Sequence, residues 1–222
     1  MNIHELHPND YIKYPRTPHL PFSEEISSDD KLISNEGLAF LNSGAELICT
    51  EKMDGGNLTM SQTHFHGRSI DSGTHAWDTQ ARALWASIRF DIPLGWRISG
   101  ESMYARRSVS YNNLPGVYLV FGIWDDKNQL LSWDETTEFA SLLDLPVVPV
   151  IYRGNSLKEA GAAWVAKHSP ETSEGFVVRS ANKVAYSDFG KRVGKYVRAN
   201  HVRTRADWRY RDDFALNTFI KE

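Results

Sequence analysis

A lysine set among acidic residues and glycines is the stretch of this sequence best suited to chemistry. Residues 51–57 read EKMDGGN, and the apolar run 47–49 leads into them. Lys52 is therefore expected where a buried strand ends and a glycine-rich turn begins. Burial disfavours the charged ammonium and nearby cations disfavour it further, so the pKa of Lys52 is predicted to be lowered, as a nucleophile requires. A surface hairpin with an ordinary lysine is the simpler alternative for so short a motif.

The neighbours of Lys52 suit a phosphate-bearing ligand. The Asp54 carboxylate can hold a ribose hydroxyl or a hydrated metal ion, since hard oxygen donors suit Mg²⁺. Gly55 and Gly56 let the backbone approach a phosphate closely or turn with a positive φ. The stretch thus combines a candidate nucleophile with candidate nucleotide contacts.

Length and composition indicate one soluble, intracellular domain. The chain has 222 residues, of which 41% are hydrophobic and 24% charged, as in ordinary soluble proteins. No apolar run approaches the ~20 residues that span a bilayer, and the N-terminus lacks a signal peptide's features. Cys49 is the only cysteine, which favours a reducing, cytoplasmic location. Its place in an apolar run predicts burial rather than nucleophilic chemistry.

The distribution of charge says more than the net charge of −3. Residues 1–46 carry eight acids and three bases, whereas residues 191–211 carry eight bases and one acid. Tyr196, Trp208 and Tyr210 lie among those bases. Cations interleaved with aromatic rings suit a phosphate backbone and exposed bases. We expect a basic C-terminal tail over 199–222; a merely solvated face is the alternative.

The elements that must position these groups alternate between helix and strand. Residues 1–30 are expected to be irregular because of their prolines, and to close one wall of the pocket. Two strands are expected within 47–70 around the lysine turn, a strand over 96–99 that ends at Gly100-Glu101, and a central strand over 117–124. Apolar spacing predicts a helix over 78–90.

Two serine-to-glutamate capping boxes predict further helices over 133–143 and 157–167. The strand expected over 147–152 contains Pro149, which places that strand at an edge or a bulge of its sheet. His64 and His66 would share a strand face, but a zinc site needs three or four ligands and no further cluster supplies them.

The ordered set of motifs resembles the covalent nucleotidyltransferases, a superfamily of polynucleotide ligases and mRNA capping enzymes, and among them the RNA ligases. Each motif is short, but together they cover nearly the whole chain in the family's order. They are Lys52-Met53-Asp54-Gly55, Arg68-Ser69, Gly100-Glu101-Ser102, the run 118–123, the run 174–179 and Lys195-Tyr196-Val197-Arg198. The flanking segments 14–20, 104–108 and 196–202 look most like those of the RNA ligases.

The resemblance implies an α+β fold: a single nucleotidyltransferase (adenylation) domain of antiparallel sheets with packed helices over 1–222. It implies no C-terminal OB-fold or helical module, because only 27 residues follow Lys195. The residue pattern alone predicts only a mixed α and β domain.

The resemblance also implies an ATP-dependent RNA ligase. AMP from ATP would become attached to Lys52, pass to a 5′-phosphate end, and leave when a 3′-hydroxyl joins that end. Lys195 and Arg68 would neutralise the α-phosphate, and Mg²⁺, or alternatively Mn²⁺, would assist. The implied nucleotide contacts are Glu51, Lys52, Asp54, Gly55, Asn57, Arg68, Glu101, Phe121, Glu174 and Lys195, with Asp54, Asn57 and Glu174 near the metal.

Several alternatives stay open at this point. Many relatives have two lysines as K-x-K in the last motif, whereas here Lys195 is followed by Tyr196 and Val197. The second cation is thus either Lys191 or Arg198. The chain could instead be a small DNA ligase, a guanylyltransferase, or a catalytically silent nucleic-acid-binding module. The form of the RNA substrate is likewise open: it could be a nicked duplex or broken strand ends, as in RNA repair.

Overall fold

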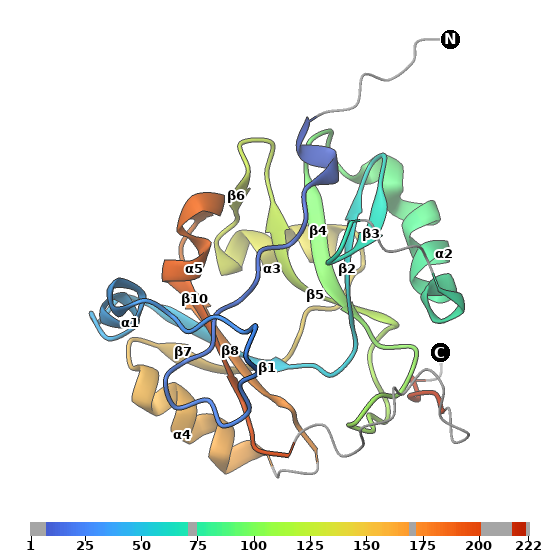
Figure 1. Ribbon diagram of the computed structural model, residues 1–222. Helices are drawn as coiled ribbons and strands as arrows, with labels where there is room; N and C mark the ends of the chain where they lie inside the picture. The colour runs from blue at the N-terminus through green and yellow to red at the C-terminus, as the bar shows by residue number, and fades with distance from the viewer. Residues whose placement is uncertain (1–7, 71–74, 169–171, 201–214, 221–222) are drawn as a thin grey trace.

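Two antiparallel sheets and five helices make up the part of the chain that the computed structural model describes, residues 8–70, 75–168, 172–200 and 215–220. Figure 1 shows the two sheets side by side, and the chain passes from one to the other directly after Lys52, between β1 and β2. The architecture is therefore the α+β arrangement of antiparallel sheets that the sequence predicts. No described helix is long and apolar enough to cross a membrane.

The smaller sheet has four strands in the order β10-β8-β1-β7. Its members are β10 (Val193–Val197), β8 (Gly175–Ser180), β1 (Leu47–Lys52) and β7 (Val150–Gly154). The strand with Pro149 before it, β7, lies at the edge as predicted, where a missing N–H costs no ladder bond. The apolar run 47–49 is in an inner strand and is fully buried.

The larger sheet has six strands in the order β3-β2-β4-β5-β6-β9. Its members are β3 (Phe65–Gly67), β2 (Gly56–Ser61), β4 (Arg97–Ser102), β5 (Tyr118–Trp124), β6 (Gln129–Leu130) and β9 (Val184–Ala185). The apolar run 117–124 is an inner strand, as its composition predicts. Two predictions need correction: β4 ends at Ser102, one residue beyond the predicted end at Gly100-Glu101, and the region 47–70 contains three strands rather than two.

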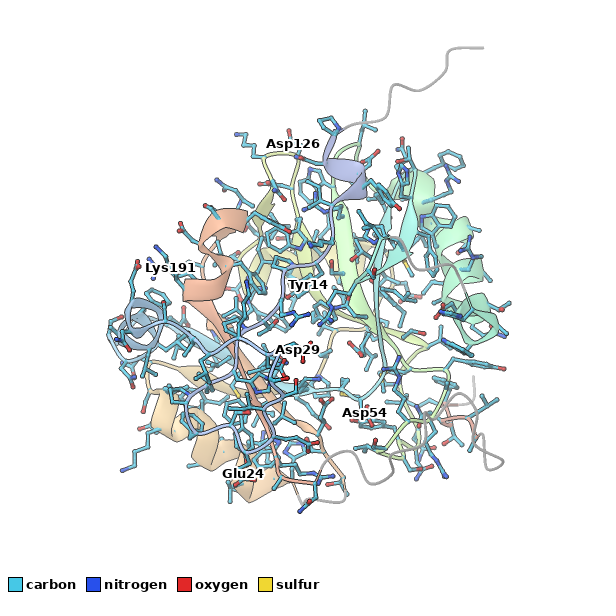
Figure 2. All side chains as sticks on the ribbon, in the orientation of Figure 1. Tyr14, Glu24, Asp29, Asp54, Asp126 and Lys191 are labelled. Carbon is cyan, nitrogen blue, oxygen red and sulfur yellow. The ribbon has the colours of Figure 1, made fainter. Side chains whose placement is uncertain are left out.

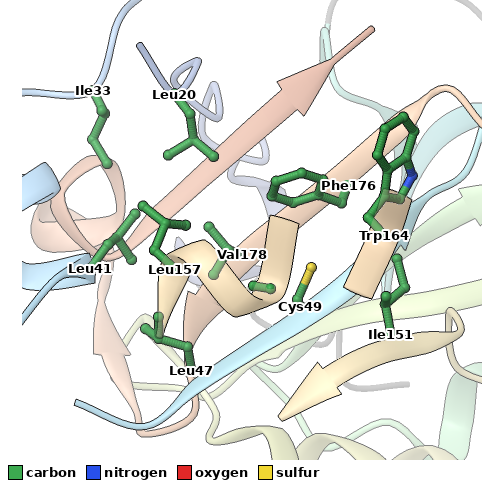
Figure 3. Packing of buried hydrophobic residues seen from close by; sticks show 11 residues of the cluster. Leu20, Ile33, Leu41, Leu47, Cys49, Ile151, Leu157, Trp164, Phe176 and Val178 are labelled. Atoms are coloured by element: carbon green, nitrogen blue, oxygen red, sulfur yellow. The ribbon is translucent and has the colours of Figure 1, made fainter. Parts of the chain in front are cut away.

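Apolar packing fixes the four-stranded sheet against helix α4 (Figure 3). Leu47 and Cys49 are two residues apart on β1, so they share a face and meet Phe176 and Val178 of β8. Trp164 of α4 (Leu157–Lys167) closes this cluster. Ile48 points to the opposite face and joins another buried cluster. Because β1 is buried on both faces, its end is held rigidly where Lys52 follows.

The three predicted helices form close to their predicted limits, as α2 (Thr79–Ile88), α3 (Trp133–Leu142) and α4. Two shorter helices, α1 (Asn35–Leu41) and α5 (Phe189–Arg192), were not predicted. Ser132 begins α3 with the full capping box predicted for it. Ser156 caps α4 by accepting from the Glu159 N–H, but the Glu159 carboxylate accepts from the Tyr152 hydroxyl instead (2.9 Å), so that box is incomplete.

The N-terminal segment is irregular apart from a short 3₁₀ turn, η1 (Pro8–Tyr11). Its residues 18–20 run along the outer edge of β10: the Leu20 N–H donates to the Lys195 carbonyl (2.8 Å) and the Lys195 N–H to the Pro18 carbonyl (2.9 Å). The segment thus extends the sheet at the strand that carries Lys195. Most of the predicted basic tail, 201–214, lies outside the described residues.

Candidate active site

Strand register brings Lys52 and Glu174 together. In the antiparallel pair β1–β8, Lys52 lies opposite Gly175, so Glu174 is one residue from the position facing the lysine. The Lys52 Nζ lies 2.6 Å from the Glu174 Oε1, and the two side chains are 25% and 10% exposed. A charge-assisted contact of this length is a strong one. The predicted nucleophile is therefore a largely buried amine held by a predicted metal contact.

The prediction of a lowered pKa for Lys52 is wrong for the free protein. Burial lowers the pKa, but the carboxylates of Glu174, Glu101 and Asp54 outweigh burial and raise it above its ordinary value. The prediction rested on nearby cations, whereas the charged groups that act on this lysine are the carboxylates. Lys52 is thus a protonated ammonium before a nucleotide binds.

Glu101 enters the site from the six-stranded sheet. In the pair β2–β4 it lies opposite Asn57, and its Oε1 accepts a hydrogen bond from the Gly55 N–H at 3.1 Å. Burial raises the pKa of Glu101 to about 7, although Lys52 and Arg107 pull it down. Glu101 is placed to accept a hydrogen bond from a ligand hydroxyl.

The space around Gly55 leaves no room for a side chain. A Cβ at this position would lie 2.4 Å from the Ser102 carbonyl oxygen, which is backbone and cannot move aside cheaply. Neither Gly55 nor Gly56 has a positive φ, so of the two roles considered for these glycines the left-handed turn does not form. The glycine permits close contact between the lysine turn and β4.

Asp54 holds a loop rather than facing into the cavity. Its Oδ2 accepts hydrogen bonds from the backbone N–H groups of Ser108 (2.7 Å) and Val109 (2.8 Å). Its own N–H donates to the Tyr111 hydroxyl at 3.1 Å. By fixing 108–109, Asp54 fixes the position of the preceding residue, Arg107, which does line the cavity.

A cavity of about 370 Å³ lies between the two sheets at this connection. It brings together eight of the ten predicted nucleotide contacts, from both sheets. These eight are Glu51, Lys52, Gly55, Asn57, Arg68, Glu101, Phe121 and Lys195. Asp54 and Glu174 stand behind this lining, in contact with the loop and with Lys52 respectively.

Phe121 stands in the cavity wall, backed by the N-terminal segment. The ring of Tyr14 packs edge-on against Phe121 with centroids 4.9 Å apart, and Tyr14, Pro15 and Thr17 all line the cavity. Figure 2 shows Tyr14 near the centre of the molecule. The segment before residue 20 therefore closes one wall, as predicted. Burial raises the pKa of the Tyr14 hydroxyl, which remains neutral.

Lys195 is tied to the N-terminal segment through Asp30. Its Nζ lies 3.4 Å from the Asp30 Oδ1, and the His19 Nε2 lies 3.3 Å from the same oxygen. Ser27 donates to the other oxygen, Oδ2, through its hydroxyl at 2.7 Å. Burial lowers the pKa of Lys195, partly offset by Asp30, and burial likewise lowers the pKa of His19.

Neither candidate for the second cation of the last motif lines the cavity. Lys191 pairs with Glu36 at 2.9 Å on the surface, and Figure 2 shows it well away from Asp54 and Tyr14. Arg198 is buried and donates through Nε to the Ser173 carbonyl (2.8 Å). Arg68, as predicted, does line the cavity.

Two arginines that the sequence analysis left without a role complete the positive wall. Arg107 and Arg179 both line the cavity. Arg179 is 3% exposed, donates to the Ser180 and Leu131 carbonyls, and has its pKa lowered to about 10 by burial. Both lie in stretches that resemble RNA ligases, 104–108 and 174–179, so their motifs were a usable signal.

The cavity suits a nucleotide with a hydrated divalent ion. No group of three His, Cys, Asp or Glu that could hold a metal occurs among the described residues. Mg²⁺ uses one or two carboxylates together with waters and substrate phosphates. Glu174 and Asp54 offer such carboxylates, and the buried Asn57 Oδ1 has no hydrogen-bond partner among the described groups. The donor set therefore fits the predicted metal.

Comparisons with known proteins bear on the family and the fold of this chain. The family model described as RNA ligase matches residues 45–197. Among curated proteins, none matches this chain. A putative ATP-dependent DNA ligase from Aquifex aeolicus has a similar structure (TM-score 0.56, 16% identity, 84% of this chain and 50% of that one).

The RNA ligase of Naegleria gruberi also has a similar structure. An apo mutant of it gives a TM-score of 0.55 at 17% identity over 90% of this chain and 62% of that one. A mutant of the same ligase with ATP and Mn gives a TM-score of 0.54 at 19% identity, over 86% of this chain and 62% of that one. At these identities the likeness concerns the fold. The chain spans about half to three-fifths of the length of these solved ligases.

Proposed function

Since the chain belongs to the RNA ligase family, we propose that it is an ATP-dependent RNA ligase that joins 3′-hydroxyl and 5′-phosphate ends. One observation carries the proposal: the Lys52 Nζ lies at the wall of a nucleotide-sized cavity, 2.6 Å from Glu174, with Lys195 on the same wall. The proposed substrate is broken or nicked RNA, and the proposed role is RNA repair in the cytoplasm. The single, buried Cys49 is consistent with a reducing compartment.

In the first step the Lys52 Nζ attacks the α-phosphorus of ATP. A P–N bond forms, the bond from that phosphorus to the pyrophosphate oxygen breaks, and pyrophosphate leaves. Lys52 must first lose its proton and its contact with Glu174, because the ammonium has no lone pair. The positive charges of Lys195, Arg68 and Arg107 favour the neutral amine and oppose the charge of the phosphates. Mg²⁺ held near Glu174, Asp54 and Asn57 would add further charge neutralisation.

Two transfers then complete the reaction. An oxygen of the 5′-phosphate attacks the AMP phosphorus, the P–N bond breaks and Lys52 regains a proton, which leaves a 5′–5′ pyrophosphate-linked strand. The 3′-hydroxyl next loses its proton and attacks the 5′-phosphorus of that strand, and AMP leaves. Throughout, Phe121 would stack on adenine, and Glu101 would accept from the ribose.

The first step provides the direct test. Protein incubated with α-labelled ATP and Mg²⁺ should acquire covalent label, whereas Lys52→Ala should acquire none because the attacking amine is gone. The matched control is Lys183→Ala, which removes a surface lysine paired with Glu135 and should label like wild type. Label retained by Lys52→Ala would remove this lysine as the nucleophile.

Substrate panels separate the remaining candidates. A small DNA ligase is the second candidate, because one similar structure is a putative ATP-dependent DNA ligase. Nicked duplexes with RNA or DNA on the 3′-hydroxyl side distinguish the two, and the proposal expects faster joining with RNA. Labelling by GTP in preference to ATP would indicate a guanylyltransferase. RNA binding without any lysyl–AMP adduct would indicate a catalytically silent module.

A further inference from the structure

A second, smaller groove of about 190 Å³ adjoins the nucleotide cavity. The two share Asn57, Arg68 and Arg107, so a ligand in one meets the same arginines as a ligand in the other. On its far side the groove is lined by His75 and Trp77, next to the start of α2. None of the steps described above uses these two aromatic residues.

We propose that this groove binds the 5′-phosphorylated end of the donor strand, with its phosphate on Arg68 and Arg107 and its first base on the His75–Trp77 pair. The inference rests on the proposed ligase function and adds the location of the donor end. Guanidinium groups bind phosphate oxygens with paired donors, and aromatic side chains stack on bases of any sequence.

The aromatic half of the groove has the geometry of a stacking surface. The rings of His75 and Trp77 are nearly parallel, 17° apart, with centroids separated by 4.5 Å. His75 is exposed and Trp77 is half-buried, so the pair is anchored on one side and accessible on the other. Asp78 also lines the groove, but its Oδ2 accepts from the His75 N–H at 3.1 Å, which holds the aromatic pair in place.

The cationic half is built on the strand that follows the lysine turn. Gly56 lies beneath Arg107: a Cβ there would stand 3.1 Å from the Arg107 Nη2. The absence of a side chain at Gly56 lets the guanidinium lie across the start of β2, at the junction of the cavity and the groove. Asp54 holds the adjoining backbone at 108–109 and so fixes this position.

Charge favours the donor end over the acceptor end. A terminal 5′-phosphate carries close to two negative charges at neutral pH, whereas a 3′-hydroxyl is neutral. Two guanidinium groups therefore bind the 5′-phosphate more strongly than the 3′-hydroxyl. The donor phosphate must also approach the AMP phosphorus for the second step, and the shared arginines place the groove beside that cavity. The other source of the same phosphate chemistry is the β- and γ-phosphates of ATP, which the experiment separates by reaction step.

The test compares Trp77→Ala with Phe90→Ala in two assays on the full chain. Phe90 is 74% exposed, lies on the same helical segment and is not part of the groove. The first assay measures covalent labelling by ATP; the second measures transfer of AMP from labelled protein to a 5′-phosphorylated RNA strand. For Trp77→Ala, the strand concentration that gives half-maximal transfer should rise about 5- to 100-fold, the usual effect of losing one base stack. Phe90→Ala should match wild type in both assays, and Trp77→Phe should recover most of the loss.

Three results would overturn or redirect the inference. If Trp77→Ala shows the wild-type dependence on strand concentration, the base does not stack there. If Trp77→Ala loses ATP labelling as severely as transfer, the groove serves ATP and the donor-end assignment is wrong. If Arg68→Ala keeps the wild-type preference for a 5′-phosphorylated over a 5′-hydroxyl strand, the phosphate is bound elsewhere. Failure of the proposed function would differ from all three, because wild-type protein would then acquire no label.

Discussion

At the scale of single residues, the partly buried amine of Lys52 and the carboxylates of Glu174 and Glu101 set the electrostatics of the cavity. Glu174 and Glu101 raise the pKa of Lys52, while Lys52 and Arg107 limit the rise in the pKa of Glu101. In the free site the amine of Lys52 is therefore in the charged form. A nucleotide whose phosphates recruit the cations and a metal that draws Glu174 away would both favour the neutral amine.

Glu101→Gln is expected to stabilise the protein in a pH-dependent way. The pKa of Glu101 is raised from its ordinary 4.5 to about 7, so the folded state favours the protonated form. Its contribution to stability is complete below pH 4.5 and is lost as the pH rises through 7. Glutamine resembles the protonated acid and does not titrate. Its advantage in the free energy of unfolding should grow from near zero at pH 4.5 to at most about 3 kcal/mol at pH 8.

Thermal or urea unfolding of both proteins across that pH range measures the difference. Glu159→Gln is a suitable control, because that carboxylate is exposed and accepts only from the Tyr152 hydroxyl. An advantage for Glu101→Gln that is constant with pH would show that the carboxylate does not titrate in this range.

At the scale of elements, the N-terminal segment acts as an additional edge of the four-stranded sheet. Backbone bonds join Pro18 and Leu20 to Lys195, and the Ile33 N–H donates to the His19 carbonyl at 2.8 Å. The segment 18–33 thereby supports the strand that carries Lys195 and places Asp30 beside its amine. It precedes the residues that the RNA ligase family model matches.

Asp30→Asn should destabilise the protein by about 1–3 kcal/mol near pH 7, since charge-assisted hydrogen bonds to Ser27 and the contact with Lys195 are weakened. Despite the opposing effect of burial, hydrogen bonds from Ser27 lower the pKa of Asp30 below its ordinary 3.8. Its contribution is therefore present above that value and is lost as the pH falls below it.

Denaturant unfolding at pH 7 and at pH 3 checks both the size and the sign. The neighbouring Asp29 is 78% exposed, so Asp29→Asn is the matched control and should change stability by less than about 0.5 kcal/mol. A larger loss for Asp30→Asn at pH 3 than at pH 7 would contradict the assigned direction.

At the scale of the whole molecule, the cavity is lined by residues of both sheets. Lys52 and Lys195 belong to the four-stranded sheet, and Glu101 and Phe121 to the six-stranded one. A nucleotide that contacts all four residues bridges the sheets. Binding should therefore stabilise the molecule as a unit rather than one sheet alone.

ATP is expected to raise the midpoint of thermal unfolding of Lys52→Ala, which cannot be labelled covalently. A ligand at 100 times its Kd contributes about 2.7 kcal/mol to the native state. Tripolyphosphate, which lacks the base and ribose, should give a smaller shift at the same concentration because it leaves Phe121 and Glu101 without contacts. Equal shifts for the two ligands would argue against binding between the sheets.

Much of the fold follows from local sequence. The apolar spacing predicts α2, Ser132 and Ser156 mark the starts of α3 and α4, and the apolar runs predict β1 and β5. These features depend on contacts within a few residues, so a single sequence contains them. The end of β4 was predicted one residue early because Gly100 reads as a terminator, whereas the strand continues to Ser102 with a register shift against β5 between Ser99 and Gly100.

The sequence by itself determined which side chains are available: a lysine at the end of a buried strand, one carboxylate at the end of a second strand, another just before a third, and cations in the last motif. Only the tertiary structure decided their partners. The register of β1 against β8 places Glu174 beside Lys52, and the chain path brings Asp30 to Lys195. The charge state of Lys52 was mispredicted for this reason. A pKa depends on distances between charges that are remote in the chain, and strand pairing sets those distances.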